Sequence, residues 1–253
     1  MSGLDLYLAA CSMLAGGVVG SFLNVVIHRL PMKQSIVSPG SRCPECGHGI
    51  RRRHNIPVLG WLMLKGRCHD CDAAISLRYP GVEALTALLF LASFLVYGVQ
   101  PRTPFVWTFL AALIVVAFID IDHRIIPNKI VVPGSVIGFG ASVALDPARW
   151  WQYLVAGLGA SGFLLLLGMI WRGGMGMGDV KMALMMGCVL GSSVIVALFA
   201  SFLIGGIGGA LLIATGLRGR RDRVPFGPYL SIGGGFAALA GAPVLEWYVR
   251  SFL

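Results

Sequence analysis

Long apolar segments occupy most of this 253-residue chain and constrain its fold more than any other feature. The longest of them, residues 182–217, runs for about 36 residues with few polar interruptions. At about 1.5 Å per residue, a single straight helix of that length far exceeds the ~30 Å hydrocarbon core of a bilayer. We therefore predict two spans in this segment, with a break near residues 191–193.

Other apolar segments have lengths typical of membrane-spanning helices, at residues 4–27, 81–99, 105–119, 130–145, 151–170 and 229–249. Charged residues make up only 12% of the chain and hydrophobic residues 57%. A soluble domain has roughly 25% charged residues, so this composition excludes a soluble enzyme and a disordered protein. The sequence predicts an all-α polytopic membrane protein with about eight transmembrane helices, the sixth of them short.

The basic residues are divided unevenly between the two sides of these predicted spans. Seventeen Lys and Arg residues fall on one side, many of them in residues 28–80, and only Arg102, Arg149 and Arg250 fall on the other. Loops rich in Lys and Arg remain in the cytoplasm. We therefore predict that the 28–80 loop is cytoplasmic and that both termini are outside. This topology accounts for the net charge of +9 without a nucleic-acid partner.

The predicted organisation has three parts. Residues 1–27 form a first transmembrane helix, residues 28–80 a cytoplasmic loop domain that contains four cysteines, and residues 81–253 a seven-helix membrane domain. Two pairs of glycines, Gly16/Gly20 and Gly205/Gly209, have the four-residue spacing that lets membrane helices approach closely. We expect both pairs to serve helix packing.

The four cysteines of the loop form two CxxC pairs separated by 21 residues, Cys43/Cys46 and Cys68/Cys71. Two such pairs can close a tetrahedron around zinc. Gly47 and Gly66 lie where we expect the tight turns to need a permissive backbone. Two disulfides or free thiols are the alternatives, although a reducing cytosol disfavours disulfides. A loop this short has little core of its own, which favours a structural zinc site.

Acidic residues in or beside membrane spans are costly and are usually functional. Asp120 and Asp122 end the predicted third span, and Asp179 follows a glycine-rich segment before the next span. Two neighbouring carboxylates can share one proton, so that one activates water and the other protonates a carbonyl. We predict this role for Asp120 and Asp179. Asp122 is better explained by an interfacial ion pair with Arg124, and a pair with Lys181 is the alternative for Asp179.

Taken together, these residues resemble the bacterial prepilin peptidases (type IV leader peptidases) of the GxGD aspartic protease family. The resemblance covers essentially the whole chain, and the order of the motifs makes it specific. The motifs are residues 20–31, the paired CxxC loop, Asn55-Ile56-Pro57, Arg78-Tyr79-Pro80 with Glu83, residues 120–128 and Gly176-Met177-Gly178-Asp179.

The resemblance implies a multi-pass endopeptidase of the bacterial inner membrane, with both termini periplasmic. Such enzymes remove the leader of type IV prepilins or type II secretion pseudopilins after a Gly, at the cytoplasmic face. Many members then methylate the new N-terminus with S-adenosylmethionine. The two catalytic aspartates of the family correspond to Asp120 and Asp179 here. The expected partners are prepilins or pseudopilins and the lipid bilayer.

Two other classes of function remain open from the sequence. One is a transporter that uses membrane carboxylates as proton or cation sites, which requires those carboxylates near the membrane midplane. The other is a non-catalytic, zinc-bearing scaffold for pilus or secretion assembly. Glu83 also has more than one interpretation, since it could orient the cytoplasmic loop, orient the substrate amine, or pair with Arg78.

Overall fold

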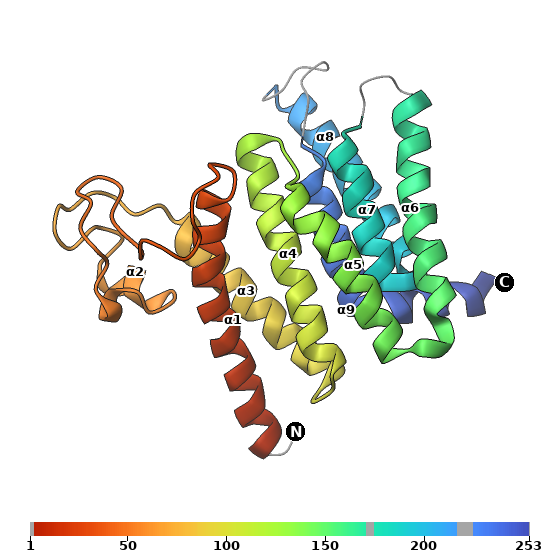
Figure 1. Ribbon diagram of the computed structural model, residues 1–253, viewed down its shortest axis with the longest axis horizontal. Coiled ribbons are helices and arrows are strands. Elements are labelled where there is room, and N and C mark those ends of the chain that lie inside the picture. Colours follow the sequence, from red (N-terminus) through yellow and green to blue (C-terminus); the bar gives the residue numbers. More distant parts are fainter. Residues whose placement is uncertain (1–2, 171–174, 217–224, 253) are drawn as a thin grey trace. The chain divides into compact units, whose positions relative to one another are not determined.

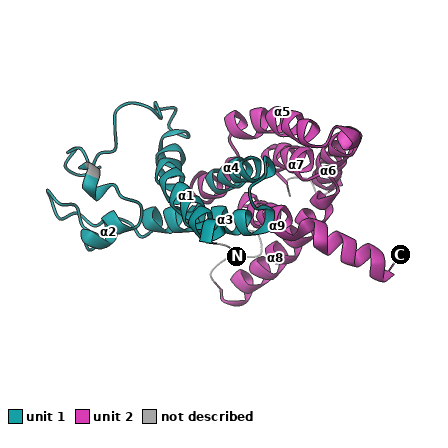
Figure 2. Cartoon of the chain, turned by 90° about the horizontal axis from the view of Figure 1, so that it is seen from below, with its two compact units in different colours: residues 1–115 teal, residues 116–253 magenta. Residues whose placement is uncertain are grey.

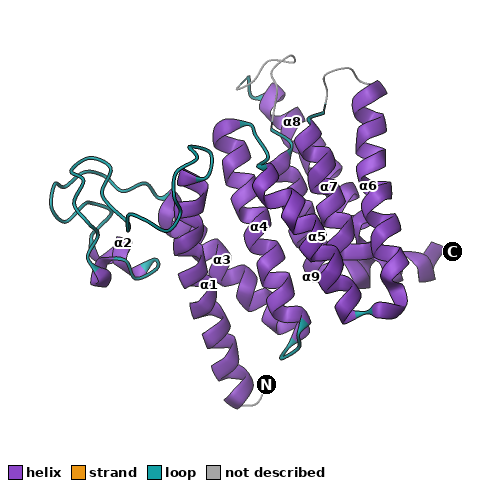
Figure 3. Ribbon diagram, viewed as in Figure 1, coloured by secondary structure: helices purple, strands orange, loops and turns teal. Residues whose placement is uncertain are grey.

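The computed structural model describes residues 3–170, 175–216 and 225–252, and the regular structure in these residues is helical (Figures 1 and 3). Two isolated β-bridges are the exception. The predicted all-α class is therefore confirmed. The α-helices of the described residues are α1 (Gly3–Arg29), α2 (Leu59–Met63), α3 (Arg78–Tyr97), α4 (Arg102–His123), α5 (Asn128–Leu145), α6 (Trp150–Ile170), α7 (Met177–Leu190), α8 (Val194–Ala214) and α9 (Gly227–Phe252).

Seven helical stretches of the described residues are long and apolar enough to cross a membrane. One of them, Met177–Ala214, is 38 residues long and is interrupted by the 3₁₀ turn Gly191–Ser193. Gly191 has a φ of 58°, a backbone conformation that glycine adopts without strain. The predicted break near residues 191–193 is thus confirmed, and it separates α8 from the 14-residue α7. At about 1.5 Å per residue, α7 is shorter than the bilayer core, as predicted for the sixth helix.

The chain forms two compact units, residues 1–115 and 116–253 (Figure 2). The division into residues 1–27, 28–80 and 81–253 stays a prediction. Five of the basic residues that supported the predicted orientation lie outside the described residues, at positions 172, 218, 220, 221 and 223.

In the first unit, α1 packs against α3 through the first predicted pair of glycines. A Cβ atom on Gly16 would lie 2.7 Å from the Cα of Ala87, and one on Gly20 would lie 2.8 Å from the Cα of Glu83. Both neighbours are backbone atoms, which cannot move aside as a side chain can. The prediction that Gly16 and Gly20 serve helix packing is confirmed.

Replacing Gly16 by Ala should therefore destabilise the protein by about 1–3 kcal/mol, because the helices must separate to admit one methyl group. Gly81→Ala is a matched control in α3, since a Cβ atom there meets no other atom within 4 Å. Thermal unfolding in detergent measures both variants. Equal melting temperatures for Gly16→Ala and Gly81→Ala would contradict the packing role.

In the second unit, glycines also set the helix contacts, but not all at the predicted positions. A Cβ atom on Gly205 of α8 would touch Phe226 and Tyr229 at 3.4 Å, whereas one on Gly209 would meet nothing within 4 Å. A Cβ atom on Gly208 would lie 3.0 Å from the Tyr229 hydroxyl. The prediction for Gly209 is wrong because the helix turns Gly208, one residue earlier, toward α9.

Candidate active site and metal centre

Asp120 lies in the last turns of α4 and is only 5% exposed. Its Oδ2 atom accepts a hydrogen bond of 3.0 Å from the backbone N–H of Gly227, the first residue of α9. The first N–H groups of a helix have no partner within the helix, and they favour a negative charge. The start of α9 therefore fixes the Asp120 carboxylate in a buried position.

Asp179 lies in the first turn of α7 and is 8% exposed. Its Oδ2 atom accepts a hydrogen bond of 3.0 Å from the backbone N–H of Gly176, the residue that caps this helix. Each aspartate is thus held by the N–H of a glycine at a helix start. The charges of Asp120 and Asp179 lie close enough to act on each other.

Two further contacts bring the segment after Asp120 against the start of α7. A Cβ atom on Gly178 would lie 2.8 Å from the Cβ of Ile126, so a larger residue would push the two segments apart. The Lys181 ammonium donates a hydrogen bond of 3.0 Å to Asn128 Oδ1. No ion pair joins Lys181 to Asp179. The alternative that Asp179 serves only as the ion-pair partner of Lys181 is therefore wrong.

Asp122 differs from these two aspartates in its surroundings. It is exposed, whereas Asp120, two residues earlier in the same helix, is buried. A helix turns by about 100° per residue, so residues two apart lie on different faces. Asp122 therefore points away from the buried carboxylate, and its ion pair with Arg124 stays a prediction.

The four cysteines of the first unit gather into one cluster, at Cys43, Cys46, Cys68 and Cys71. Their Sγ atoms all lie within 4.8 Å of one another. The two CxxC turns repeat the same hydrogen bonds: the N–H of Cys43 donates to His48 O, and that of Cys68 donates to Ala73 O. These four side chains could hold a metal ion.

A residue with positive φ follows each CxxC turn. Gly47 has a φ of 71°, as predicted for the first turn. At the equivalent position of the second turn the residue is Asp72, with a φ of 56°. Gly66 also has a positive φ, of 71°, but it follows α2 and precedes the turn. The permissive backbone predicted for Gly66 is therefore confirmed, and the residue that follows the second turn is Asp72, a residue type that tolerates positive φ.

The thiols of this cluster differ in acidity. The backbone N–H groups of Cys46 and Glu45 lower the pKa of the Cys43 thiol to about 7. The N–H of Ala73 favours the thiolate of Cys71, but desolvation and the neighbouring cysteines outweigh it and raise the pKa of Cys71 to about 12. A bound cation would stabilise all four as thiolates, because thiol ligands bind a metal in their deprotonated form.

Glu83 lies in α3 and contacts the loop segment that follows the first CxxC pair. Its Oε2 atom accepts a hydrogen bond of 2.6 Å from the backbone N–H of Val58. Val58 has a φ of 61°, an uncommon value for a β-branched residue. The carboxylate thus holds a strained backbone in place, which agrees with the prediction that Glu83 orients the loop.

Gly227 is the residue at this site that the sequence did not reveal. Gly227-Pro228 marks a helix start, since Pro is common at the first helical positions. Nothing in the sequence connects this start with Asp120, which precedes it by 107 residues.

Comparison with known proteins gives two matches that together cover most of the chain. Residues 14–97 match the bacterial peptidase A24 N-terminal domain, and residues 107–210 match the type IV leader peptidase family. No solved structure matches the chain.

The similar proteins of known function agree with these matches. A prepilin leader peptidase/N-methyltransferase of Aeromonas salmonicida is 36% identical over 93% of this chain and 92% of its own length. The protein of the same name from Pseudomonas aeruginosa is 34% identical over 95% of this chain and 93% of its own length. The one from Bacillus subtilis is 33% identical over 94% of this chain and 96% of its own length. The chain therefore belongs to the type IV leader peptidase family.

Proposed function

We propose that this protein is a membrane aspartic endopeptidase that cleaves the leader from type IV prepilins or type II secretion pseudopilins. Cleavage follows a Gly and takes place at the cytoplasmic face of the inner membrane. The observation that carries the proposal is the pair of buried carboxylates, Asp120 and Asp179, each held by a glycine N–H at a helix start. The names of the similar proteins support this substrate class.

The pair of carboxylates can hydrolyse a peptide bond if it carries one proton. The ionised carboxylate takes a proton from water as the water oxygen attacks the scissile carbonyl carbon. The protonated carboxyl group gives its proton to the carbonyl oxygen, which yields a neutral diol. The diol then returns one proton to the second aspartate while the first protonates the leaving nitrogen, and the C–N bond breaks. The two products leave, and the pair again carries one proton.

The position of the aspartates favours a peptidase over a transporter. Asp120 lies at the end of α4 and Asp179 at the start of α7. A carboxylate-based transporter requires its acids near the midplane of the membrane. Carboxylates at helix ends instead meet a substrate at the membrane surface, where the leader of a membrane-anchored substrate would leave the bilayer.

A second activity is N-methylation of the newly exposed amine, with S-adenosylmethionine as the methyl donor. Its support is the name shared by the similar proteins, prepilin leader peptidase/N-methyltransferase. In the proposed topology the cysteine loop is cytoplasmic and both termini are periplasmic. The excess of Lys and Arg in residues 28–80 supports this orientation.

We also propose that the cysteine cluster binds a structural zinc ion. Four sulfur ligands about 2.3 Å from a tetrahedral zinc ion lie about 3.8 Å from one another. The Sγ atoms of Cys43 and Cys71 are 3.8 Å apart, and the other pairs lie within 4.8 Å. Four cysteines complete the coordination shell and leave no position for substrate, so the ion would serve folding.

Replacing Cys68 by Ser should remove the zinc ion, lower the melting temperature and reduce methylation more than leader cleavage. The reason is that zinc joins the two CxxC turns, whereas the aspartates lie in the other unit. Elemental analysis, thermal unfolding and product mass measure the three effects. Cys11→Ser is the matched control, since Cys11 lies in α1 outside the cluster. Full methylation by a zinc-free Cys68→Ser protein would contradict this role.

The test of the peptidase function is cleavage of a prepilin with a Gly-bearing leader by the purified protein in liposomes. The expected product has lost the mass of the leader, and a further methyl mass reports the second activity. A protein that does not cleave prepilin but carries proton-coupled flux would be a transporter. A protein inactive in both assays that still requires its cysteines for pilus assembly would be a scaffold.

A further inference from the structure

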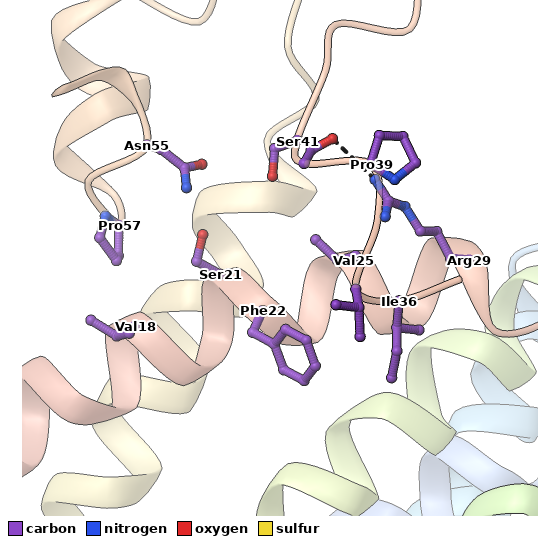
Figure 4. Close-up of a pocket in the computed structure, with 12 residues that line it drawn as sticks. Val18, Ser21, Phe22, Val25, Arg29, Ile36, Pro39, Ser41, Asn55 and Pro57 are labelled. Carbon is purple, nitrogen blue, oxygen red and sulfur yellow. Dashed lines mark hydrogen bonds between the residues drawn. The ribbon is translucent and has the colours of Figure 1, made fainter. Parts of the chain in front are cut away.

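A cavity of about 300 Å³ lies in the first unit, between α1 and the loop that follows it (Figure 4). We call it the α1 groove. Figure 4 shows the side chains of Ser21, Ser41 and Asn55 turned toward one another on one side of this space. The remaining lining side chains are mainly apolar, and one residue, Arg29, carries a formal charge.

The wall of the α1 groove opposite the helix is held by specific bonds. The segment with Asn55 and Pro57 is tied to α3 by the hydrogen bond from Val58 N–H to Glu83. The loop after α1 is tied by Arg29, whose guanidinium donates to Ser35 O at 3.0 Å and to Gly40 O at 3.2 Å. The groove is therefore a built feature of the unit and not a chance gap between loops.

The floor of the α1 groove is a stripe along one face of α1, formed by Val18, Ser21, Phe22, Val25 and Arg29. From the first to the last of these residues the helix rises about 16 Å, close to the depth of one bilayer leaflet. Val18 is 64% exposed and Phe22 49% exposed. The α1 side of the groove is thus apolar except at Ser21, and it is charged at the end where α1 leads into the cysteine loop.

The charge of the α1 groove selects an anion. A guanidinium has five N–H donors, and the two bonds to Ser35 and Gly40 leave others for a ligand. No carboxylate of the described chain lies within ion-pair distance of Arg29, and none lines the groove. A cationic ligand such as the sulfonium of S-adenosylmethionine would find no counter-charge there.

We propose that the α1 groove binds one anionic phospholipid, with its phosphate at Arg29 and an acyl chain along Val18, Phe22 and Val25. Basic pockets at the cytoplasmic ends of membrane helices recognise anionic headgroups. A volume of about 300 Å³ lies at the lower end of the range of ligand pockets, so it accommodates the headgroup and the upper part of one chain. The lower part of the chain lies against the exposed apolar face of α1.

The test measures lipid binding directly and is therefore independent of peptidase activity. The purified full-length protein is placed in phosphatidylcholine nanodiscs that contain a small fraction of phosphatidylglycerol, and the retained lipids are counted by native mass spectrometry. Wild type should retain phosphatidylglycerol in preference to phosphatidylcholine. Arg29→Gln should lower that retention about fivefold, the factor expected for one basic residue at a membrane surface. Arg29→Lys, which keeps the charge, should restore most of it.

Lys65→Gln is the matched control because it removes one positive charge from the same loop without touching the groove. Ser21→Trp is a second variant that fills the groove and leaves Arg29 in place. It should also lower the retention of phosphatidylglycerol. Melting temperature and zinc content establish that each variant is folded.

Three outcomes would overturn the proposal. Wild type could retain the two lipids equally, or the folded Arg29→Gln protein could retain phosphatidylglycerol as Lys65→Gln does. In the third outcome, the Ser21→Trp protein would retain phosphatidylglycerol as wild type does but would no longer bind labelled S-adenosylmethionine. That last result would assign the groove to the methyl donor.

Discussion

Asp120→Asn and Asp179→Asn are each expected to lower the rate of leader cleavage by at least about 10³-fold. An amide of the same shape keeps the buried position but can neither take a proton from water nor give one to the carbonyl oxygen. The loss should appear in the catalytic step, while the variants still bind substrate. A time course of product mass from a prepilin in liposomes measures the rate.

Asp122→Asn is the matched control for this pair. Asp122 carries the same charge in the same helix, two residues from Asp120, but it is exposed. Its replacement should change the cleavage rate by less than about threefold, as expected for an exposed charge at an interface. Full activity in Asp120→Asn with complete loss in Asp122→Asn would transfer the catalytic role to the exposed aspartate.

Gly227→Ala is expected to lower the cleavage rate about 10²-fold, although Gly227 contributes no side chain. A Cβ atom at this position would lie 2.6 Å from Oδ2 and 3.0 Å from Cγ of Asp120. Either the carboxylate or the start of α9 must move, and the hydrogen bond from Gly227 N–H is then lost. A displacement of about 1 Å at a catalytic group can cost this factor. Cleavage kinetics at saturating substrate should show the loss in kcat.

Gly206→Ala provides the comparison for this substitution. Gly206 lies in α8, and a Cβ atom there meets nothing within 4 Å. It should leave both cleavage and melting temperature close to those of wild type. A Gly227→Ala protein with a lowered melting temperature but normal kcat would show that the glycine serves only helix packing. Normal kcat and normal stability together would show that the contact with Asp120 has no role.

The structure gives each glycine of the GxGD motif a separate physical role. The sequence alone marks Gly176 and Gly178 as residues that let the backbone turn before a helix. In the structure, Gly176 donates its N–H to Asp179, and Gly178 makes room for Ile126. The first contact is local and follows from the rules of helix capping. The second joins segments 52 residues apart and depends on how the start of α7 packs against the loop between α4 and α5.

The sequence by itself determined the all-α membrane class, the break in the longest apolar segment, the cysteine cluster and the identity of the two buried aspartates. These features follow from local patterns, such as apolar length, ligand spacing and the cost of an acid beside a membrane span. Tertiary structure alone decided that Gly227 holds Asp120, that Gly208 packs α8 on α9 in place of Gly209, and that Glu83 ties down Val58. Such contacts depend on which faces of distant helices meet, and spacing along one chain segment does not specify the rotation of its partner.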